Sequence, residues 1–410
     1  MSGSDLLPRL RYVDAFPVDV DGQRLIYLRD PEGLAKDGLY VSPHLFELMA
    51  LLDGDRSTRD LQKLYAKANE GAMLGEDQVD ELISSLDEAL LLDSERFQKH
   101  RADVKANYRN EVRRPSPLAG RSYPDDPDAL RLLIDSFFED ESGPPNVPSG
   151  VDVVTGIVAP HIDFARGGPC FAWAYNELRY SDPADIYVVL GTGHTSRSPF
   201  STTRKVFETP LGDLKVDSAF VDRLVEHAPQ DLFEDEIAHK NEHSIEFQAV
   251  FLQYLFPDAD IKFVPILCGS FSAAVDASVS PMEHPEVEGF VVALKKTLDE
   301  ETRNVCLIAG VDFSHVGERF GDQGPMTDAF MSQVRSSDLD LTAAAESLDS
   351  EAFFDVIVRD YDRHRVCGTS SIFTMLQVLK ASRGKLLKYD QAVDREEDSM
   401  VTYASMAFYE

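Results

Sequence analysis

Three apolar strand-like segments, each ending in a turn that carries a histidine, constrain the fold of this chain more than any other feature. In Val188–His194, the run Val-Val-Leu is followed by Gly-Thr-Gly-His. Thr155–His161 and Val305–His315 repeat the design. Strands without polar alternation are typical of parallel sheets that helices cover on both faces. Because the carboxyl ends of parallel strands meet at one edge of a sheet, we expect the three histidines to share a pocket there.

Further strand and helix patterns predict the architecture around this pocket. The strand patterns lie near residues 151–159, 185–190, 261–267 and 304–310. Helical patterns separate them, and this alternation predicts an α/β fold with a central, largely parallel sheet covered by helices. Two more strands, expected in Lys385–Tyr389 and Val401–Phe408, would make the sheet mixed.

The first hundred residues have a different pattern, in which short strands precede short helices. Arg24–Arg29 is strand-like, and apolar residues at three-to-four spacing then indicate three helices. We therefore predict a small winged-helix-like domain over residues 8–100. Residues 101–116 are charged and end in Arg-Arg-Pro-Ser-Pro, which favours a linker, so that residues 117–410 form the α/β domain.

Composition excludes several classes of partner. The chain has 72 acidic and 40 basic residues and a net charge of −32, which disfavours nucleic acid or an anionic membrane surface as its partner. No apolar run approaches the roughly 20 residues of a membrane-spanning helix, and the N-terminus lacks the pattern of a signal peptide. The four cysteines show no close pairing. We expect a cytoplasmic protein whose thiols are free or of which one is a metal ligand.

The strand-end histidines have polar neighbours that suit a metal site. His161 is followed two residues later by Asp163, a candidate orienting carboxylate, although a solvated loop histidine is the alternative. His194 follows two glycines, which allow the backbone to approach a ligand closely. Asp312 and His315 follow the third strand as a base–acid pair or as ligands, unless Asp312 only caps the next turn.

One cysteine stands apart from the other three. Cys367 immediately precedes a helical pattern, and a helix N-terminus favours the thiolate, which suits a soft metal ligand or a nucleophile. The remaining cysteines lie in apolar surroundings and are expected in the core.

The densest polar cluster is His239-Lys-Asn-Glu-His243. It matches the H-x-x-E-H pattern of a class of zinc proteases, in which Glu242 would be the general base. The apolar helical pattern begins only after His243, however, which places His239 in a preceding loop. His243 and Glu246 are one helical turn apart and are therefore expected to point together.

Residues from about 116 to 410 resemble the Memo family, also called AmmeMemoRadiSam system protein B. Five motifs carry the resemblance in the family's order: Ala159–His161, Leu190–His194, Glu242–Glu246, Val311–His315 and Val366–Gly368. The family's fold is similar to that of class III extradiol dioxygenases, with a metal pocket at the strand ends.

The resemblance implies roles for individual residues. The metal ligands would be His161, His194 and Cys367. Catalytic or pocket residues would be Asp312, His315, His243 and Glu246. The chain departs from the family's Pro-His-Ala-Gly-Tyr and Gly-Pro-Ser-His-His at residues 160–164 and 191–195, which alters the pocket wall and the expected substrate preference.

The N-terminal region resembles PqqD-like winged-helix domains, which bind peptide segments in radical-SAM-type maturation systems. Residues 51–58 and the closing Leu90-Leu-Leu92 carry this resemblance. It implies a radical SAM protein as a partner.

Three functions follow as hypotheses. The first is an iron- or copper-dependent redox enzyme of the Memo family, with zinc as a further candidate metal and a small molecule or a peptide as substrate. The second is a non-catalytic module that binds a peptide or protein in the same pocket. The third is a metallohydrolase in which Asp312 or Glu246 acts as base on a metal-bound water.

Overall fold

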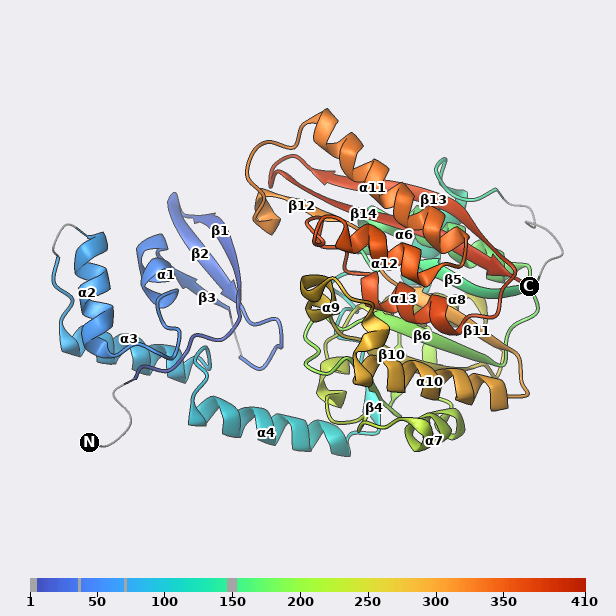
Figure 1. Cartoon of the computed structure of the whole chain (residues 1–410), viewed down its shortest axis with the longest axis horizontal. Helices are drawn as coiled ribbons and strands as arrows, with labels where there is room; N and C mark the ends of the chain where they lie inside the picture. Colours follow the sequence, from blue (N-terminus) through green and yellow to red (C-terminus); the bar gives the residue numbers. More distant parts are fainter. Residues whose placement is uncertain (1–5, 36–37, 70–71, 146–152) are drawn as a thin grey trace. The chain divides into compact units, whose positions relative to one another are not determined.

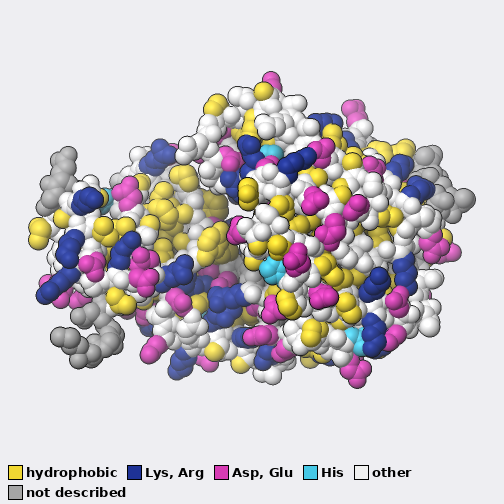
Figure 2. Space-filling model, in the orientation of Figure 1, with side chains coloured by type: hydrophobic (Ala, Val, Ile, Leu, Met, Phe, Trp, Pro, Cys, Tyr) yellow, Lys and Arg dark blue, Asp and Glu magenta, His cyan; other side chains and the backbone are white. Residues whose placement is uncertain are grey.

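The chain folds into two compact units, Met1–Asn110 and Glu111–Glu410. The computed structural model describes residues 6–35, 38–69, 72–145 and 153–410 (Figure 1). Within these ranges, none of the helices combines the length and apolar character that crossing a bilayer requires. Acidic and basic side chains are interspersed over the face shown in Figure 2, with many Asp and Glu among them.

The first unit is a three-stranded antiparallel sheet followed by four helices. The strands are β1 (Asp14–Val20), β2 (Gln23–Arg29) and β3 (Leu39–Val41). The helices are α1 (Pro43–Met49), α2 (Thr58–Ala68), α3 (Glu76–Glu88) and α4 (Glu95–Asn110). Ser57 caps α2 in a capping box with Asp60, which satisfies amide groups that the first turn leaves without partners. The sheet and helices enclose a leucine-rich core of their own.

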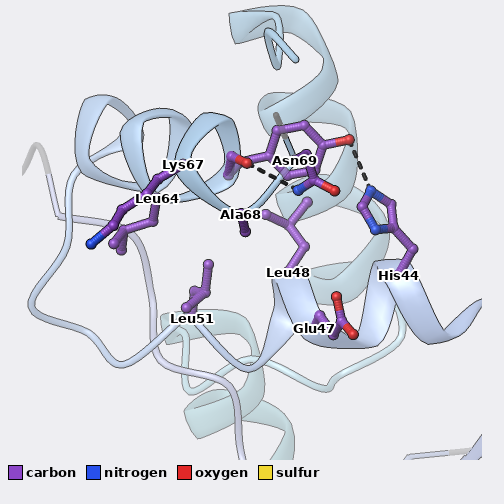
Figure 3. Close-up of a pocket in the computed structure, with 9 residues that line it drawn as sticks. His44, Glu47, Leu48, Leu51, Leu64, Lys67, Ala68 and Asn69 are labelled. Carbon is purple, nitrogen blue, oxygen red and sulfur yellow. Dashed lines mark hydrogen bonds between the residues drawn. The ribbon is translucent and has the colours of Figure 1, made fainter. Parts of the chain in front are cut away.

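A groove of about 400 Å³ lies between α1 and α2 in this unit (Figure 3). Leucines line it, among them Leu48, Leu51 and Leu64. At its rim, His44 Nε2 and Tyr65 OH are 2.9 Å apart.

The segment predicted as a linker, residues 101–116, is largely regular structure. Helix α4 continues through Asn110, and Arg113–Arg114 forms strand β4, which pairs with β8 (Val206–Thr209). Phe97 and Tyr108, both buried, are three helical turns apart and therefore share one face. The many charges on the other faces conceal this apolar stripe in the sequence.

The second unit is built on an eight-stranded mixed sheet. Its order is β12-β14-β5-β11-β6-β10-β7, and β13 pairs with β14. The strands are β5 (Val154–Ala159), β6 (Ile186–Thr192), β7 (Phe200–Thr202), β10 (Lys262–Cys268), β11 (Val305–Gly310), β12 (His315–Gly317), β13 (Arg383–Asp394) and β14 (Ser399–Tyr409). All six strands expected in this region are present. Residues 151–152 of the first lie outside the described residues.

The four central strands, β5, β11, β6 and β10, are parallel, and the other pairings of the sheet are antiparallel. Although β5 and β6 are consecutive in the chain, β11 lies between them. The chain therefore reverses its direction across the sheet, and such switch points open a crevice at the carboxyl ends of the strands.

Helices cover both faces of the sheet, as Figure 1 shows. The helices of this unit are α5 (Pro127–Glu139), α6 (Phe164–Arg179), α7 (Ser218–His227), α8 (Ser244–Leu255), α9 (Ser272–Ala277), α10 (Pro285–Glu300), α11 (Asp328–Glu346), α12 (Ser350–Val358) and α13 (Thr369–Val378). Both α8 and α13 contact β6 and β11. A small second sheet has the order β4-β8-β9, with β9 at Gly212–Leu214.

Two glycines bring α8 close to the end of the sheet. Gly191 and Gly310 pair with each other on β6 and β11. A Cβ atom at Gly191 would lie 2.5 Å from Ile245 Cγ1, and one at Gly310 would lie 2.7 Å from the Ser244 carbonyl oxygen. Only glycine allows this approach, which places the residues before α8 at the carboxyl edge.

Candidate metal centre

The strand-end histidines converge at the carboxyl edge of the parallel strands. Ala159 and Gly191 both pair with Gly310, so β5, β6 and β11 end at the same level. His161 and His194 each follow their strand by two residues. Cys367 reaches the same place from the turn before α13, where the Gly368 amide donates to the Asp312 carbonyl. Two of the three strand-end histidines, His161 and His194, therefore converge as the sequence predicts, and Cys367 joins them.

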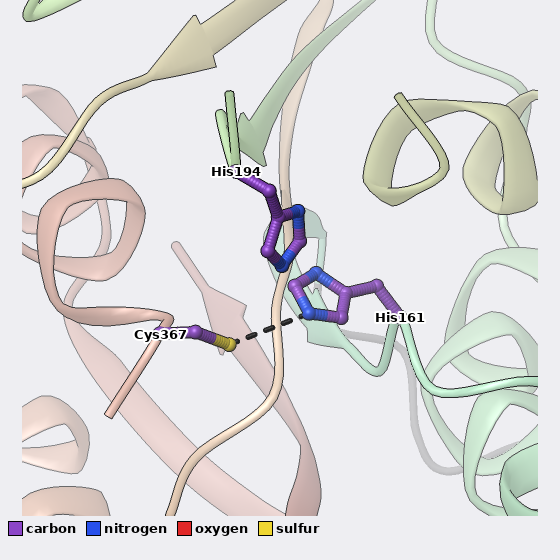
Figure 4. A group of neighbouring side chains, drawn as sticks. All are labelled: His161, His194 and Cys367. Carbon is purple, nitrogen blue, oxygen red and sulfur yellow. Dashed lines mark hydrogen bonds between the residues drawn. The ribbon is translucent and has the colours of Figure 1, made fainter. Parts of the chain in front are cut away.

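Three side chains form a compact donor set (Figure 4). His161 Nε2 lies 3.3 Å from Cys367 Sγ. The donor atoms of His161, His194 and Cys367 all lie within 4.8 Å of one another. The set comes from three segments that are far apart in the sequence.

The His161 ring is held in one tautomer. Its Nδ1 is 3.1 Å from the Gly310 carbonyl oxygen, which can only accept a hydrogen bond. The hydrogen must therefore be on Nδ1, and the Nε2 lone pair is left facing Cys367. The residue is 2% exposed, so water does not compete for this lone pair.

His194 is oriented in the same way by a carboxylate. Its Nδ1 is 3.0 Å from Glu242 Oε1, and its backbone N–H donates to Glu242 Oε2 at 3.1 Å. Glu242 also accepts the N–H groups of His243 and Ser244, at 2.8 and 3.0 Å. A carboxylate behind a histidine fixes the ring and makes the outward nitrogen a better ligand.

The spacing of His161 and Cys367 fits two ligands of one metal ion. A metal–sulfur bond of about 2.3 Å and a metal–nitrogen bond of about 2.0 Å place tetrahedral donors roughly 3.5 Å apart. The His161–Cys367 separation of 3.3 Å is close to this value. Both imidazoles also carry the outer hydrogen bond that metal-binding histidines almost always have.

Burial sets the protonation of these ligands. Burial, with the nearby His194 and His243, holds the pKa of His161 well below its ordinary value of 6.5, so the ring is neutral. Burial and the Asp312 carboxyl raise the pKa of the Cys367 thiol well above 9.0. A metal ion must therefore displace the thiol proton, and metal affinity rises with pH.

Asp312 holds the His161 turn instead of capping its own. Its Oδ1 accepts the backbone N–H groups of His161 and Ile162, at 3.0 and 3.2 Å. Its Oδ2 lies 3.7 Å from His161 Nε2. Burial raises the pKa of Asp312 to about 7, against the effect of the two amides. The side chain is therefore in the site, where one oxygen anchors the His161 turn and the other faces the His161 ring.

His315 begins β12 and lies beside the donor set but is not part of it. Its Nδ1 is 3.1 Å from the Phe313 carbonyl oxygen, and its ring packs edge-on against Phe320. Burial lowers the pKa of His315 to about 4. The ring is therefore a neutral side chain at neutral pH.

Asp163, the carboxylate expected to orient His161, has another role. It caps α6 by accepting the Arg166 N–H at 3.2 Å. The backbone carbonyl of Gly310 orients His161 instead. A contact with a backbone carbonyl leaves no pattern in the sequence.

His243 precedes α8 as expected, and its ring stacks on that of His194 with 4.6 Å between centroids. The prediction that Glu246 is its partner is wrong. Glu246 accepts hydrogen bonds from Arg114 at 2.7 Å and Tyr123 at 2.6 Å. The carboxylate beside His243 Nδ1 is that of Glu242, at 3.2 Å. Because the helix begins at Ser244, helical spacing does not apply to Glu242. The sequence indicates Glu242 only as the neighbour of His243 and as the general base of the H-x-x-E-H pattern.

The H-x-x-E-H pattern does not form a site of its own. His239 ends a separate 3-10 turn, Glu236–His239, and its buried ring lies 3.4 Å from Ser201 Oγ. Burial lowers the pKa of His239 to about 3. Among the described residues, the second group with metal-like spacing is His194, Glu242 and His243, in which Glu242 is already engaged by backbone amides.

Comparison with known proteins places the chain in a family. The family described as Memo-like protein matches residues 113–407. A MEMO1 family protein of Aquifex aeolicus is 33% identical over 98% of this chain and 100% of its own length. MEMO1 family proteins of Methanopyrus kandleri and Desulfurococcus amylolyticus are 31% and 32% identical over 72% and 73% of this chain and over 99% and 100% of their own lengths. The chain therefore belongs to the Memo-like protein family.

Proposed function

We propose that this protein binds one metal ion through His161, His194 and Cys367 and uses it for redox chemistry. The observation that carries the proposal is the pair of imidazoles whose Nδ1 atoms are engaged by Gly310 and Glu242, and whose donor atoms lie within 4.8 Å of each other and of the Cys367 sulfur. Two imidazoles and a thiolate suit iron or copper, and zinc also accepts them. Bound iron or copper would supply one-electron chemistry and activation of dioxygen.

The surrounding residues would bind the substrate and move protons. The side chains of His194 and His243 are 36% and 35% exposed, which opens the site on that side. The ring of His243 is oriented by Glu242 at Nδ1, which leaves Nε2 to exchange a proton with a substrate. Asp312, with a pKa of about 7, would hold or release a second proton near neutral pH. A small molecule or an exposed segment of a peptide would enter from the open side.

A radical SAM protein is the partner that we propose for the first unit. The support is the resemblance of that unit to PqqD-like domains. The Aquifex aeolicus relative matches this chain over nearly its full length, first unit included.

Metal analysis of protein purified without oxygen tests the central claim. We expect about one iron or copper ion per chain in the wild type and almost none in the triple variant His161→Ala, His194→Ala, Cys367→Ala. Equal, low metal content in both proteins would remove the proposed site.

The type of chemistry needs a separate experiment. Redox function predicts that the iron- or copper-loaded protein consumes dioxygen in the presence of a reductant, and that Cys367→Ser is slower. Chelator-sensitive hydrolysis of simple esters without oxygen uptake would instead favour the metallohydrolase.

A further inference from the structure

Arg114 is a fully buried cation in the outer layer of this site. Both its side chain and that of its partner Glu246 are almost completely excluded from water, at 0% and 1% exposure. Removing a guanidinium from water is costly unless every donor finds an acceptor in good geometry. The buried pair of Arg114 and Glu246 lies directly behind the loop that carries Glu242 and His243.

The guanidinium binds three separate points of that loop and helix. Its Nε donates to the His239 carbonyl at 2.6 Å, and one terminal nitrogen donates to the Glu242 carbonyl at 2.5 Å. The other terminal nitrogen donates to Glu246 Oε2 at 2.7 Å. One planar group thus fixes the segment 239–246 from both sides of Glu242.

Glu246 extends the network to the start of the unit. Its Oε1 accepts the Tyr123 hydroxyl at 2.6 Å and the Leu118 N–H at 3.1 Å. Both carboxylate oxygens of Glu246 are therefore engaged, one by Arg114 and the other by Tyr123 and Leu118.

The path from Arg114 to the proposed metal ligand has a single intermediate residue. The backbone carbonyl of Glu242 is bound by Arg114, and its carboxylate is bound by both the backbone and the Nδ1 of His194. A shift of the Glu242 backbone would move the acceptor that fixes the His194 tautomer.

We propose that Arg114 is a positioning residue of the metal centre, which acts by holding Glu242 in place behind His194. This inference rests on the proposed metal function. Lysine should not replace it, because a single ammonium on a flexible stem cannot donate along three fixed directions in one plane.

The neighbouring Arg113 provides a matched control. It lies on the same strand, β4, but it is exposed and pairs on the surface with Glu208 and Asp213. Arg113→Lys makes the same chemical change one residue away from the buried network.

The experiment compares the full-length wild type, Arg114→Lys and Arg113→Lys in two measurements. Titration with Cu(I) and with Fe(II) should show a loss of affinity of about 10- to 100-fold for Arg114→Lys and none for Arg113→Lys, as for other outer partners of metal ligands. Histidine-selective NMR of the metal-free proteins should show one His194 tautomer in the wild type and in Arg113→Lys, and a mixture in Arg114→Lys.

Each outcome decides the proposal. A folded Arg114→Lys protein with one His194 tautomer and unchanged affinity would overturn it. If the wild type binds no metal, the proposed function fails, and the tautomer comparison alone still decides the role of Arg114. If Arg114→Lys does not fold, the same measurements are made on Glu246→Gln. Glutamine keeps the shape of the Glu246 side chain and removes only its charge, which is the ionic partner of Arg114. An affinity loss of about threefold or more is then expected, and none would overturn the inference.

Discussion

The two ends of the parallel strands β5, β11, β6 and β10 differ in what their loops carry. At the carboxyl edge, His161, His194 and Cys367 place donor atoms within 4.8 Å of one another. The amino edge has a cavity of about 670 Å³, lined by residues that include Glu301, Arg303 and Lys380. Its described lining contains no histidine or cysteine.

The basic side chains that line the amino-edge cavity are paired with carboxylates. Arg303 pairs with Asp217 at 2.6 Å and with Glu301 at 2.8 Å, and Lys380 pairs with Asp299 at 2.7 Å. At the carboxyl edge, by contrast, His161 Nε2 contacts the Cys367 thiol at 3.3 Å, and the His194 donor atom lies within 4.8 Å of both. The comparison teaches that cavity volume alone does not identify a chemical site on this sheet, and that the clustered donor set is the feature on which the proposed function rests.

The largest expected effect tests this difference directly. His161→Ala should lower the affinity for Cu(I) or Fe(II) by about 100-fold or more, because it removes a ligand and not merely an outer partner. Arg303→Ala at the amino edge should leave that affinity unchanged. Competition titration of the two variants measures both, and equal losses would mean that the two edges are not functionally distinct.

A smaller loss is expected when the carboxylate behind His194 is changed. Glu242→Gln keeps the shape but weakens four charge-assisted hydrogen bonds, so metal affinity should fall by about 10- to 100-fold. Glu301→Gln makes the same change at the amino edge and serves as the control. An affinity for Glu242→Gln equal to that of the control would show that His194 does not need the carboxylate.

The carboxyl edge was predictable from the sequence because it depends on local patterns. Continuous apolar strands followed by Gly, Pro and His reveal both the strands and the residues at their ends. The predicted strand near 304–310, for example, is β11 at Val305–Gly310. The parallel arrangement then brings His161, His194 and Asp312 together without further information.

The remainder depends on contacts between distant segments. No local pattern indicates that β11 lies between β5 and β6, or that the Gly310 carbonyl orients His161. Helical spacing suggested Glu246 as the partner of His243, whereas the turn before α8 supplies Glu242. Arg114 looked like part of a linker, because its acceptors are more than a hundred residues away in the chain.

A buried carboxyl beneath the carboxyl edge should make stability depend on pH. Asp338 on α11 accepts hydrogen bonds from Ser314, Thr402 and Tyr389, at 2.6, 2.7 and 2.8 Å. Burial nevertheless raises its pKa from 3.8 to about 6. The folded state therefore binds the proton more tightly than the unfolded state, and ionisation costs stability as the pH rises through this window.

Asp338→Asn should remove this dependence. As the pH rises from about 4 to 6.5, the free energy of unfolding of the variant should increase relative to that of wild type by on the order of 2 kcal/mol. Denaturant unfolding followed by the fluorescence of Trp173, the single tryptophan of the chain, reports on the second unit alone. A difference between the two proteins that does not change with pH would contradict the expectation.

The smallest expected effect is a stability change at the amino edge, where the dependence on pH has the opposite sign to that of Asp338. Hydrogen bonds from Arg303 lower the pKa of Glu301 from 4.5 to about 2, although burial opposes the shift. The stabilisation is complete above pH 4.5 and is lost as the pH falls toward 2. Glu301→Gln should therefore be less stable than wild type near neutral pH. Its deficit is at most about 1 kcal/mol, because the 39%-exposed Arg303 is partly screened by solvent, and it should shrink on acidification. The same Trp173 measurement decides this. The stability difference from wild type should change with pH in opposite directions for Glu301→Gln and Asp338→Asn. If both differences change in the same direction, the paired charges at the amino edge behave like the buried groups at the carboxyl edge, and the contrast between the two ends of the sheet is lost.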